Sequence, residues 1–404
     1  MHILLIHQAF AALDEPGGTR HHELSRYFAE QGHEVTIITS PISYLTGKPR
    51  REKIQWVDKQ TDGSHITILR VYAYPALHRN FAYRVINFMS FMISSFWVGL
   101  RVKKVDLVWG TSPPIFQGLT AWALARLKNA PFLFEVRDLW PAFAVAVGVL
   151  RQPFLIKLSE WLEQFLYRHA DKVVVNSPGF VQHVQSRGAA QVEVVPNGTD
   201  TSMFNPSVDG STFRSAHGLE DKFIALYAGA HGLSNDLSVV LEAAHKMLSR
   251  KDIKIVLLGD GKDKPALQSR AIMDNLENIC FLPPIPKIEM PFALAAANAC
   301  IAILKPVELY KTTYPNKVFD YMAAGKPVIL AIDGVIRDVI ENAGAGIPVP
   351  PGDPDALANA IMSLADDPRL AHHMGKQARE YVEIYFNRET LASNFNKILV
   401  QLVL

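Results

Sequence analysis

The feature that most constrains the fold is an alternation of short apolar runs with helical stretches along all 404 residues. Several runs are apolar almost throughout, as strands covered on both faces must be, and this alternation is typical of parallel α/β sheets. The first half contains the expected strands His2–His7, Val35–Thr39, Ile66–Val71, Val105–Trp109, Phe132–Arg137, Lys172–Asn176 and Val192–Val195. The pattern then restarts with Phe223–Tyr227, Ile253–Leu258, Ile279–Leu282, Cys300–Leu304 and Val328–Ala331.

The segment Pro196–Pro206 between the halves is rich in turn-forming residues, so we place the domain boundary near residue 200. The length also fits two domains of about 200 residues each. Paired sheets of this kind are expected to bind ligands in a cleft at the carboxyl ends of their strands. That geometry suits an enzyme with one substrate on each domain.

Composition excludes several classes of protein. A net charge of +2 argues against a dedicated nucleic-acid binder, and Cys280 and Cys300 are too isolated for a disulfide framework or a zinc site. The first residues lack the basic region of a signal peptide, and the longest apolar candidate, Phe88–Leu100, is interrupted by serines. We therefore expect a cytoplasmic protein without a membrane span.

A glycine pair, Gly17-Gly18, ends the loop after the first strand and precedes a helix. Backbone N–H groups at such a position can bind an anion, although a simple tight turn would use the same residues. The adjacent His21, His22 and Glu23 do not indicate a metal site, because consecutive helical residues point in different directions.

Two further motifs follow strands. Arg137 and Asp138 stand at the carboxyl end of the expected strand Phe132–Arg137, and Trp140 follows them. An ordinary surface ion pair is the alternative interpretation. The segment Ala228–Asp236 repeats the order of strand, glycine loop and helix, which predicts a second anion site with His231 as a donor or as a structural histidine.

Polar donors crowd a helix start near Pro315. They are Thr312, Thr313, Asn316 and Lys317, and such clustering suits a diphosphate. Asp320 lies one turn further on, where it could bind a ribose diol. A purely structural helix would not require this clustering, so we favour a functional role.

Together these motifs resemble those of the retaining glycosyltransferases of family 4. The resemblance rests on Gly17-Gly18, Gly32-His33-Glu34-Val35, Val195–Phe204, Leu258–Gly261 and Phe319–Ile329, in the family's order over nearly the whole chain. Arg137–Pro141 and Pro315–Lys317 are similar to a bacterial surface-polysaccharide branch that includes L-fucosaminyl (N-acetyl) transferases.

The resemblance implies the GT-B fold, with two Rossmann-like domains whose parallel sheets face a central cleft. Residues 1–200 would bind the acceptor and residues 201–385 the nucleotide sugar, and a helix near residues 386–404 would cross back to the first domain. Donor contacts would come from Gly17, Gly18, Gly229, His231, Gly259, Gly261, Thr312, Thr313, Asn316 and Asp320. Arg20, His21 and Trp140 would lie on the acceptor side, and Arg137, Asp138, Lys311 and Lys317 at the reacting centre.

The implied mechanism retains the anomeric configuration. Fixed donors stabilise the departing diphosphate, whose β-phosphate oxygen accepts the acceptor's proton. No metal or other cofactor is expected, because lysines and helix N-termini neutralise the leaving group.

Three departures from the family pattern surround the sugar and the diphosphate. Thr312 stands where the first acid of the family's acid pair is expected, with Asp320 at the second. The usual Arg and Lys are missing from Ala228–Asp236, and Arg137 replaces a common histidine. Lys311 and Lys317 would supply the lost positive charge. These changes favour an unusual donor, such as a deoxy or acetamido sugar, and the nucleotide is expected to be UDP.

The expected function is sugar transfer from a nucleotide diphosphate donor to a lipid-linked or glycan acceptor in bacterial surface-polysaccharide synthesis. Two alternatives stay open: a nucleotide-sugar epimerase on the same fold, and a non-catalytic sugar-nucleotide binding protein.

The segment 79–104 is crowded with aromatic residues and bounded by basic ones. Its Phe88, Phe91 and Trp97, with a second segment at Arg151–Arg168, predict contact with the inner membrane surface. Helices packed on the first sheet are the alternative.

Overall fold

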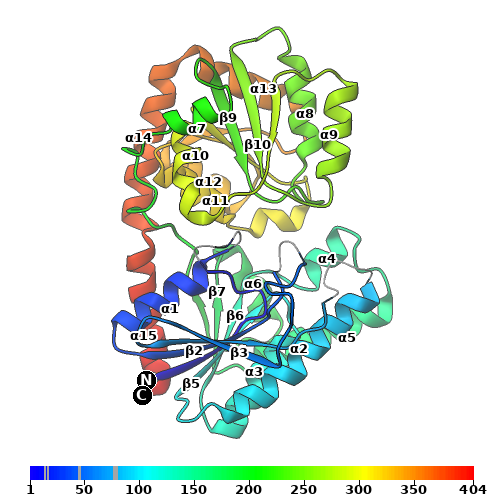
Figure 1. Cartoon of the computed structure of the whole chain (residues 1–404), viewed down its shortest axis with the longest axis vertical. Coiled ribbons are helices and arrows are strands. Elements are labelled where there is room, and N and C mark those ends of the chain that lie inside the picture. Colours follow the sequence, from blue (N-terminus) through cyan, green and yellow to red (C-terminus); the bar gives the residue numbers. More distant parts are fainter. Residues whose placement is uncertain (13–14, 16–17, 44–46, 76–80) are drawn as a thin grey trace. The chain divides into compact units, whose positions relative to one another are not determined.

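The computed structural model describes residues 1–12, 15, 18–43, 47–75 and 81–404. The chain forms two compact units (Figure 1). Unit 1 comprises Met1–Pro196 together with Glu389–Leu404, and unit 2 comprises Asn197–Arg388. Gly17, which the sequence analysis expects to contact the donor, lies outside the described residues.

Within the described residues, unit 1 contains an eight-stranded sheet in the order β3-β4-β2-β1-β5-β6-β7-β8. Neighbouring strands are parallel except β3, which runs antiparallel to β4. The strands are β1 His2–Ile6, β2 Glu34–Thr39, β3 Val57–Asp62, β4 Ile66–Val71, β5 Leu107–Ser112, β6 Phe132–Val136, β7 Lys172–Val175 and β8 Val192–Val194.

Helices cover both faces of this sheet. They are α1 Arg20–Glu30, α2 Phe81–Arg101, α3 Gln117–Lys128, α4 Ala142–Ala146, α5 Pro153–His169, α6 Val181–Ser186 and α15 Arg388–Val403, with the 3-10 turn η1 Pro178–Phe180. On one face the rings of Phe28 (α1), Trp109 (β5) and Phe395 (α15) pack together at 5.1 to 6.1 Å. The last helix is therefore part of the core of unit 1.

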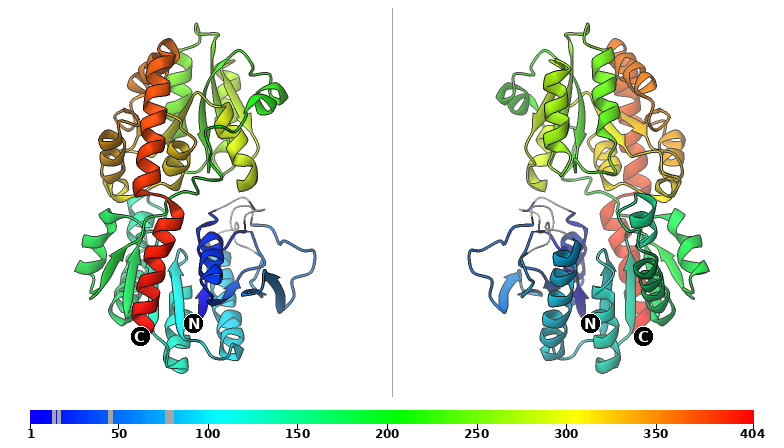
Figure 2. Two further views of the ribbon diagram at one scale, coloured as in Figure 1. Left: turned by 90° about the vertical axis from the view of Figure 1, so that its left-hand side faces the viewer. Right: turned by 90° about the vertical axis from the view of Figure 1, so that its right-hand side faces the viewer.

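On the other face, α2, α3 and α5 lie side by side (Figures 1 and 2). The close approach of α3 to the sheet depends on glycine. A Cβ built on Gly110 of β5 would lie 2.7 Å from the Ala121 Cβ, and one on Gly118 of α3 would lie 2.9 Å from the Phe134 ring of β6. Any side chain at these positions would push the helix away from the sheet.

Unit 2 has a parallel sheet in the order β11-β10-β9-β12-β13-β14. Its strands are β9 Phe223–Ala228, β10 Ile253–Leu258, β11 Ile279–Leu282, β12 Ala299–Ile303, β13 Val328–Ala331 and β14 Gly346–Pro348. Buried side chains form a core on each face, because β9, β10 and β12 send alternate residues to opposite sides.

The helices of unit 2 are α7 Ser211–Ala216, α8 Leu237–Lys246, α9 Lys264–Met273, α10 Met290–Ala296, α11 Asn316–Ala323, α12 Val335–Ala343, α13 Pro354–Asp366 and α14 Pro368–Tyr385. The 3-10 turns are η2 Lys287–Glu289 and η3 Glu308–Thr312. None of the described helices is both long and apolar enough to cross a membrane.

Candidate active site

In unit 2, two glycines bring the loops after β9 and β10 into direct contact. Gly229 has φ +148° and Gly259 has φ +147°, a region that side-chain-bearing residues rarely adopt. A Cβ built on Gly259 would lie 1.9 Å from the Gly229 carbonyl oxygen. Gly261 is equally constrained, since its Cβ would lie 2.3 Å from the His231 carbonyl oxygen. The sequence-predicted donor residues Gly229, His231, Gly259 and Gly261 thus form one loop pair.

The ammonium of Lys317 lies against this loop pair. It reaches over from α11, with its Nζ 3.8 Å from the Tyr227 ring centroid and 2.6 Å from where a Gly229 Cβ would stand. Within the described residues this buried Nζ has no hydrogen-bond partner. Burial lowers the pKa of Lys317 to about 7. A desolvated ammonium of this kind is well suited to bind an anion.

His231 contributes a neutral imidazole to the same place. Neither ring nitrogen has a hydrogen-bond partner in the part of the chain that the structure describes. Burial, followed by the charges of Lys264 and Lys317, lowers the pKa of His231 to about 4. At neutral pH one ring nitrogen therefore carries a proton that it can donate to a phosphate.

Asp320 is held by two residues that the sequence analysis did not single out. Its carboxylate accepts a hydrogen bond from the Thr199 hydroxyl at 2.8 Å and pairs with Lys287 at 2.5 Å. A ribose diol would have to share these oxygens, whose further lone pairs allow a second bond each. Thr199 could have been suspected from its place in the boundary segment, but nothing in the sequence pointed to Lys287.

The remaining residues near Pro315 are less closely gathered. The hydroxyls of Thr312 and Thr313 donate to the carbonyls of Leu309 and Tyr310, and Asn316 begins α11. Lys311 is half exposed and pairs with Glu308 at 2.7 Å. Among the described contacts, none joins Lys311 to the loop pair of Gly229 and Gly259. The structure therefore does not bring Lys311 together with the expected donor residues of that loop pair.

In unit 1, two of the expected acceptor-side residues, Arg20 and His21, contact Glu135. The Arg20 guanidinium donates to Glu135 at 2.9 Å and to the carbonyls of Pro196 and Val195, and the His21 Nε2 lies 2.6 Å from Glu135. Burial opposes ionisation of Glu135, but His21 and Arg20 lower its pKa overall. Arg20 is buried, and these contacts tie α1 to β6 and to the end of unit 1.

Glu135 itself was missed by the sequence analysis. It is the one charged residue within the apolar strand Phe132–Val136, and a buried carboxylate there requires a cation nearby. That requirement could have connected it with the arginine and histidine after the glycine pair.

Two histidine rings continue the cluster. The His7 ring lies 4.1 Å from that of His21, and within the described residues neither His7 nitrogen has a hydrogen-bond partner. Burial, and then the charges of His21 and Arg137, lower the pKa of His7 well below its usual value. Burial likewise lowers the pKa of His21 to about 4, so both imidazole rings are neutral at pH 7.

Arg137 and Asp138 follow β6 beside this cluster. A Cβ on Gly18 would lie 3.5 Å from the Arg137 guanidinium, so the structure brings together the glycine loop and the Arg-Asp motif. Burial raises the pKa of Asp138 to about 6, although Arg137 acts in the opposite direction. Trp140, two residues after Asp138, is half-buried. Its indole N–H has no hydrogen-bond partner within the described residues.

Sequence comparison assigns each half of the chain to a known type of domain. Residues 17–198 match the family described as "Glycosyl transferase 4-like domain", and residues 210–381 match "Glycosyl transferases group 1". The chain is a glycosyltransferase.

Individual relatives agree with this assignment. WcaI of Escherichia coli (strain K12), described as a candidate colanic acid biosynthesis glycosyl transferase, is 25% identical over 386 residues, which cover 92% of this chain and 93% of WcaI. WbjE of Pseudomonas aeruginosa, described as a glycosyltransferase, is 23% identical and covers 66% of this chain and 68% of its own.

Solved structures confirm the predicted GT-B fold of this glycosyltransferase. Sucrose-phosphate synthase from Thermosynechococcus elongatus superposes with a TM-score of 0.81 at 22% identity, over 99% of this chain and 98% of its own. HepE of Anabaena, solved in complex with UDP and glucose, superposes with a TM-score of 0.74 at 15% identity, over 99% of this chain and all of its own.

Proposed function

We propose that this glycosyltransferase transfers a sugar, with retention of configuration, from a UDP-linked donor to a lipid-linked glycan in bacterial surface-polysaccharide synthesis. Unit 2 binds the donor and unit 1 the acceptor. The observation that carries the donor assignment is the buried ammonium of Lys317, which lies against Gly229 beside His231. An ammonium and a neutral imidazole at glycine loops provide the charge and the N–H donors that a diphosphate requires.

The structures of HepE in complex with UDP support the choice of UDP as the donor nucleotide. The description of WcaI as a candidate colanic acid biosynthesis glycosyl transferase supports the choice of pathway. The changes at Thr312 and Arg137 support a donor sugar with altered hydroxyls, of the deoxy or acetamido kind.

Calorimetry with UDP, GDP, ADP and dTDP tests the donor assignment. We expect UDP to bind most tightly, and Lys317→Met to weaken UDP binding by about 1.5 to 3 kcal/mol, the size of a charge-assisted contact. Uridine binding should hardly change, because it lacks phosphates. Lys376→Met on α14 removes an equally long but exposed cation and serves as the matched control.

Equal losses for UDP and uridine would assign Lys317 to the fold instead. Incubation of UDP-sugars with and without acceptor then separates transfer from epimerisation, since an epimerase would convert the donor alone.

We further propose that unit 1 rests on the membrane surface through α2 and α5. The exposed side chains Ile86, Ile93 and Trp97 follow helical spacing on α2, and Phe154, Leu158 and Trp161 do so on α5. Trp97 is 53% exposed and Trp161 58% exposed, whereas Phe91 is fully buried in the packed face. Exposed aromatics flanked by basic residues are typical of helices that lie in a lipid interface.

A further inference from the structure

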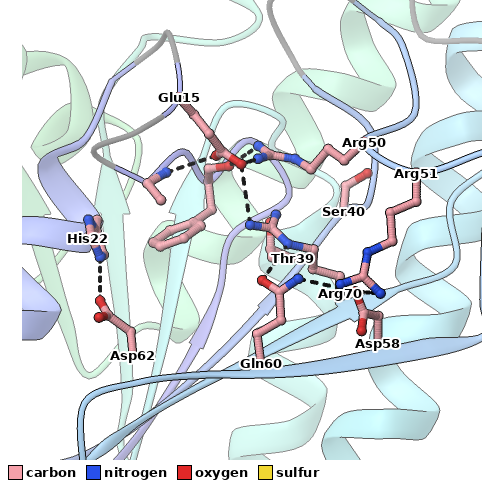
Figure 3. A network of polar contacts seen from close by, with 12 residues as sticks. Glu15, His22, Thr39, Ser40, Arg50, Arg51, Asp58, Gln60, Asp62 and Arg70 are labelled. Atoms are coloured by element: carbon pink, nitrogen blue, oxygen red, sulfur yellow. Dashed lines mark hydrogen bonds and ion pairs between the residues drawn. The ribbon is translucent and has the colours of Figure 1, made fainter. Parts of the chain in front are cut away.

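A polar pocket of about 380 Å³ lies in unit 1 against the β3–β4 hairpin (Figure 3). Its walls include His22 of α1, Pro41, several residues between Arg50 and Gln55, and the facing residues of β3 and β4. Pro41 follows β2, and Arg70 stands near the carboxyl end of β4. Ligands of α/β folds bind at this edge of the sheet. The function proposed above gives this pocket no role.

Basic side chains gather in the pocket. Arg70 is only 6% exposed, and its guanidinium reaches the Glu15 carboxylate at 3.5 Å. Arg50 pairs with the same carboxylate oxygen and also donates to the Phe10 carbonyl at 3.2 Å. Two guanidinium groups thus converge on one carboxylate, as Figure 3 shows.

The pocket as a whole carries more positive than negative charge. Arg50, Arg51, Lys53 and Arg70 line it together with Glu15, Asp58 and Asp62. Arg51 pairs with Asp58 at 3.2 Å, and Asp62 pairs with His22 at 2.6 Å. Lys53 forms no ion pair with any residue that the structure describes. The cationic part of the pocket is therefore the part around Glu15, because Arg50 and Arg70 both lie there.

The remaining lining residues suit a sugar. Gln60 accepts a hydrogen bond from Arg70 at 3.3 Å and donates to Asp58 at 3.2 Å, and Gln55 also faces the pocket. Amides and carboxylates bind sugar hydroxyls, while converging guanidinium groups bind the oxygens of a carboxylate or phosphate. The Glu15 carboxylate, which comes from the loop after β1, marks where such an oxyanion would bind.

We propose that this pocket binds an acceptor sugar that carries an oxyanion, and that Glu15 competes with that oxyanion for Arg50 and Arg70. The inference rests on the proposed function, which assigns the acceptor to unit 1. The oxyanion is either the carboxylate of an acidic sugar or a phosphate attached to the sugar, and both would use the same two guanidinium groups.

Calorimetry on the full chain with saturating UDP tests the proposal. The probes are glucuronate, glucose 1-phosphate and the neutral methyl glucoside. We expect at least one anionic probe to bind about tenfold more tightly than methyl glucoside. Arg50→Gln should remove most of this difference, and Glu15→Gln should strengthen anion binding because it removes the competing carboxylate. Arg126→Gln, an exposed arginine on α3, is the matched control and should bind like the parent protein.

Preference for glucuronate would identify an acidic sugar, and preference for glucose 1-phosphate would identify a phosphate. Anionic probes that bind no better than methyl glucoside would overturn the proposal, as would equal effects of Arg50→Gln and Arg126→Gln. Weaker anion binding in Glu15→Gln would also overturn it, and this variant decides the matter if Arg50→Gln fails to fold.

UDP affinity, measured for each variant, keeps this test separate from the donor assignment. A parent protein that does not bind UDP would contradict the proposed function, while titration of the probes without UDP would still test Arg50 and Glu15.

Discussion

Lys311 and Lys317 flank the start of α11 and have opposite surroundings. Lys311 is exposed, and its ion pair with Glu308 raises its pKa. Lys317 is enclosed by Tyr227 and Gly229, and burial lowers its pKa to about 7. A ligand phosphate would therefore gain more from Lys317, because the ammonium there has already lost its water.

This environment predicts that UDP binding is linked to proton uptake. Above pH 7 Lys317 is largely neutral in the free protein, and a bound diphosphate favours its charged form and raises its pKa. UDP binding at pH 8 should therefore take up as much as about one proton, and the affinity should fall as the pH rises further. His231 stays neutral over this range, since its pKa is about 4.

Calorimetry at pH 8 in two buffers with different ionisation enthalpies measures the uptake. Lys317→Met should abolish it, and Lys376→Met should not. Proton uptake that persists in Lys317→Met would mean that another group titrates.

Asp138 predicts a pH-dependent change in stability. Its folded pKa is about 6 against an ordinary 3.8, so its neutral form is favoured by folding. This contribution is fully present below about pH 4 and is lost as the pH rises through 6. Asp138→Asn should therefore raise the unfolding free energy by about 1 to 3 kcal/mol at pH 7.5, with little effect at pH 4.

Thermal unfolding of both proteins at these two pH values measures the difference. A gain that is the same at both, or a loss at pH 7.5, would show that the Asp138 carboxylate is stabilised by its neighbours in the folded protein.

Individual residues show how far the site could be predicted from the sequence. Gly229, His231, Gly259 and Lys317 do come together, because each follows a strand or begins a helix at one edge of a sheet. Glu135, Lys287 and the pairing of Arg70 with Glu15 could not be predicted, because they depend on side chains from distant segments. Motif order carries no information on such contacts.

At the scale of elements, the sequence analysis missed two edge strands, β3 and β14, although it predicted the other two edge strands, β8 and β11. The strand β3, with the sequence VDKQTD, is an antiparallel edge strand whose polar residues show no apolar run. The three-residue β14 contains a proline and was also missed. The expected Val105–Trp109 is instead Leu107–Ser112, since the pairing with β6 extends through Gly110 and Thr111, residues without strong strand preference.

The helices α2 and α5 give a prediction at this scale. Trp97→Glu and Trp161→Glu should each reduce co-sedimentation with liposomes of anionic lipid, because a carboxylate on the apolar stripe opposes insertion. Ile272→Glu on α9 of unit 2, a 77% exposed apolar residue, is the matched control and should sediment as the parent does.

UDP binding should be unchanged in all three variants. A parent protein that does not sediment with liposomes would contradict the membrane proposal. Normal transfer to a lipid-linked acceptor after loss of sedimentation would show that the helices do not serve catalysis.

For the whole molecule, a diphosphate site whose positive charge comes from a lysine predicts how activity responds to metal chelators. In the function proposed above, Lys317, His231 and the N-terminus of α11 would supply the stabilisation that divalent metal ions often supply. Transfer activity should therefore survive excess EDTA. Loss of activity that magnesium or manganese restores would show that the lysine does not act alone.

The two-segment construction of unit 1 has a consequence for synthesis of the chain. Ala392, Phe395 and Leu399 of α15 belong to the same core as Phe28 and Trp109. On the ribosome, the first 196 residues emerge without this helix, so the apolar groove that receives it stays open while unit 2 is translated. Unit 2 is continuous in sequence and can complete its fold first, which reverses the usual order in which N-terminal domains mature first. During that interval the nascent chain exposes an apolar surface of the kind that chaperones bind. This exposure ends only when α15 leaves the exit tunnel.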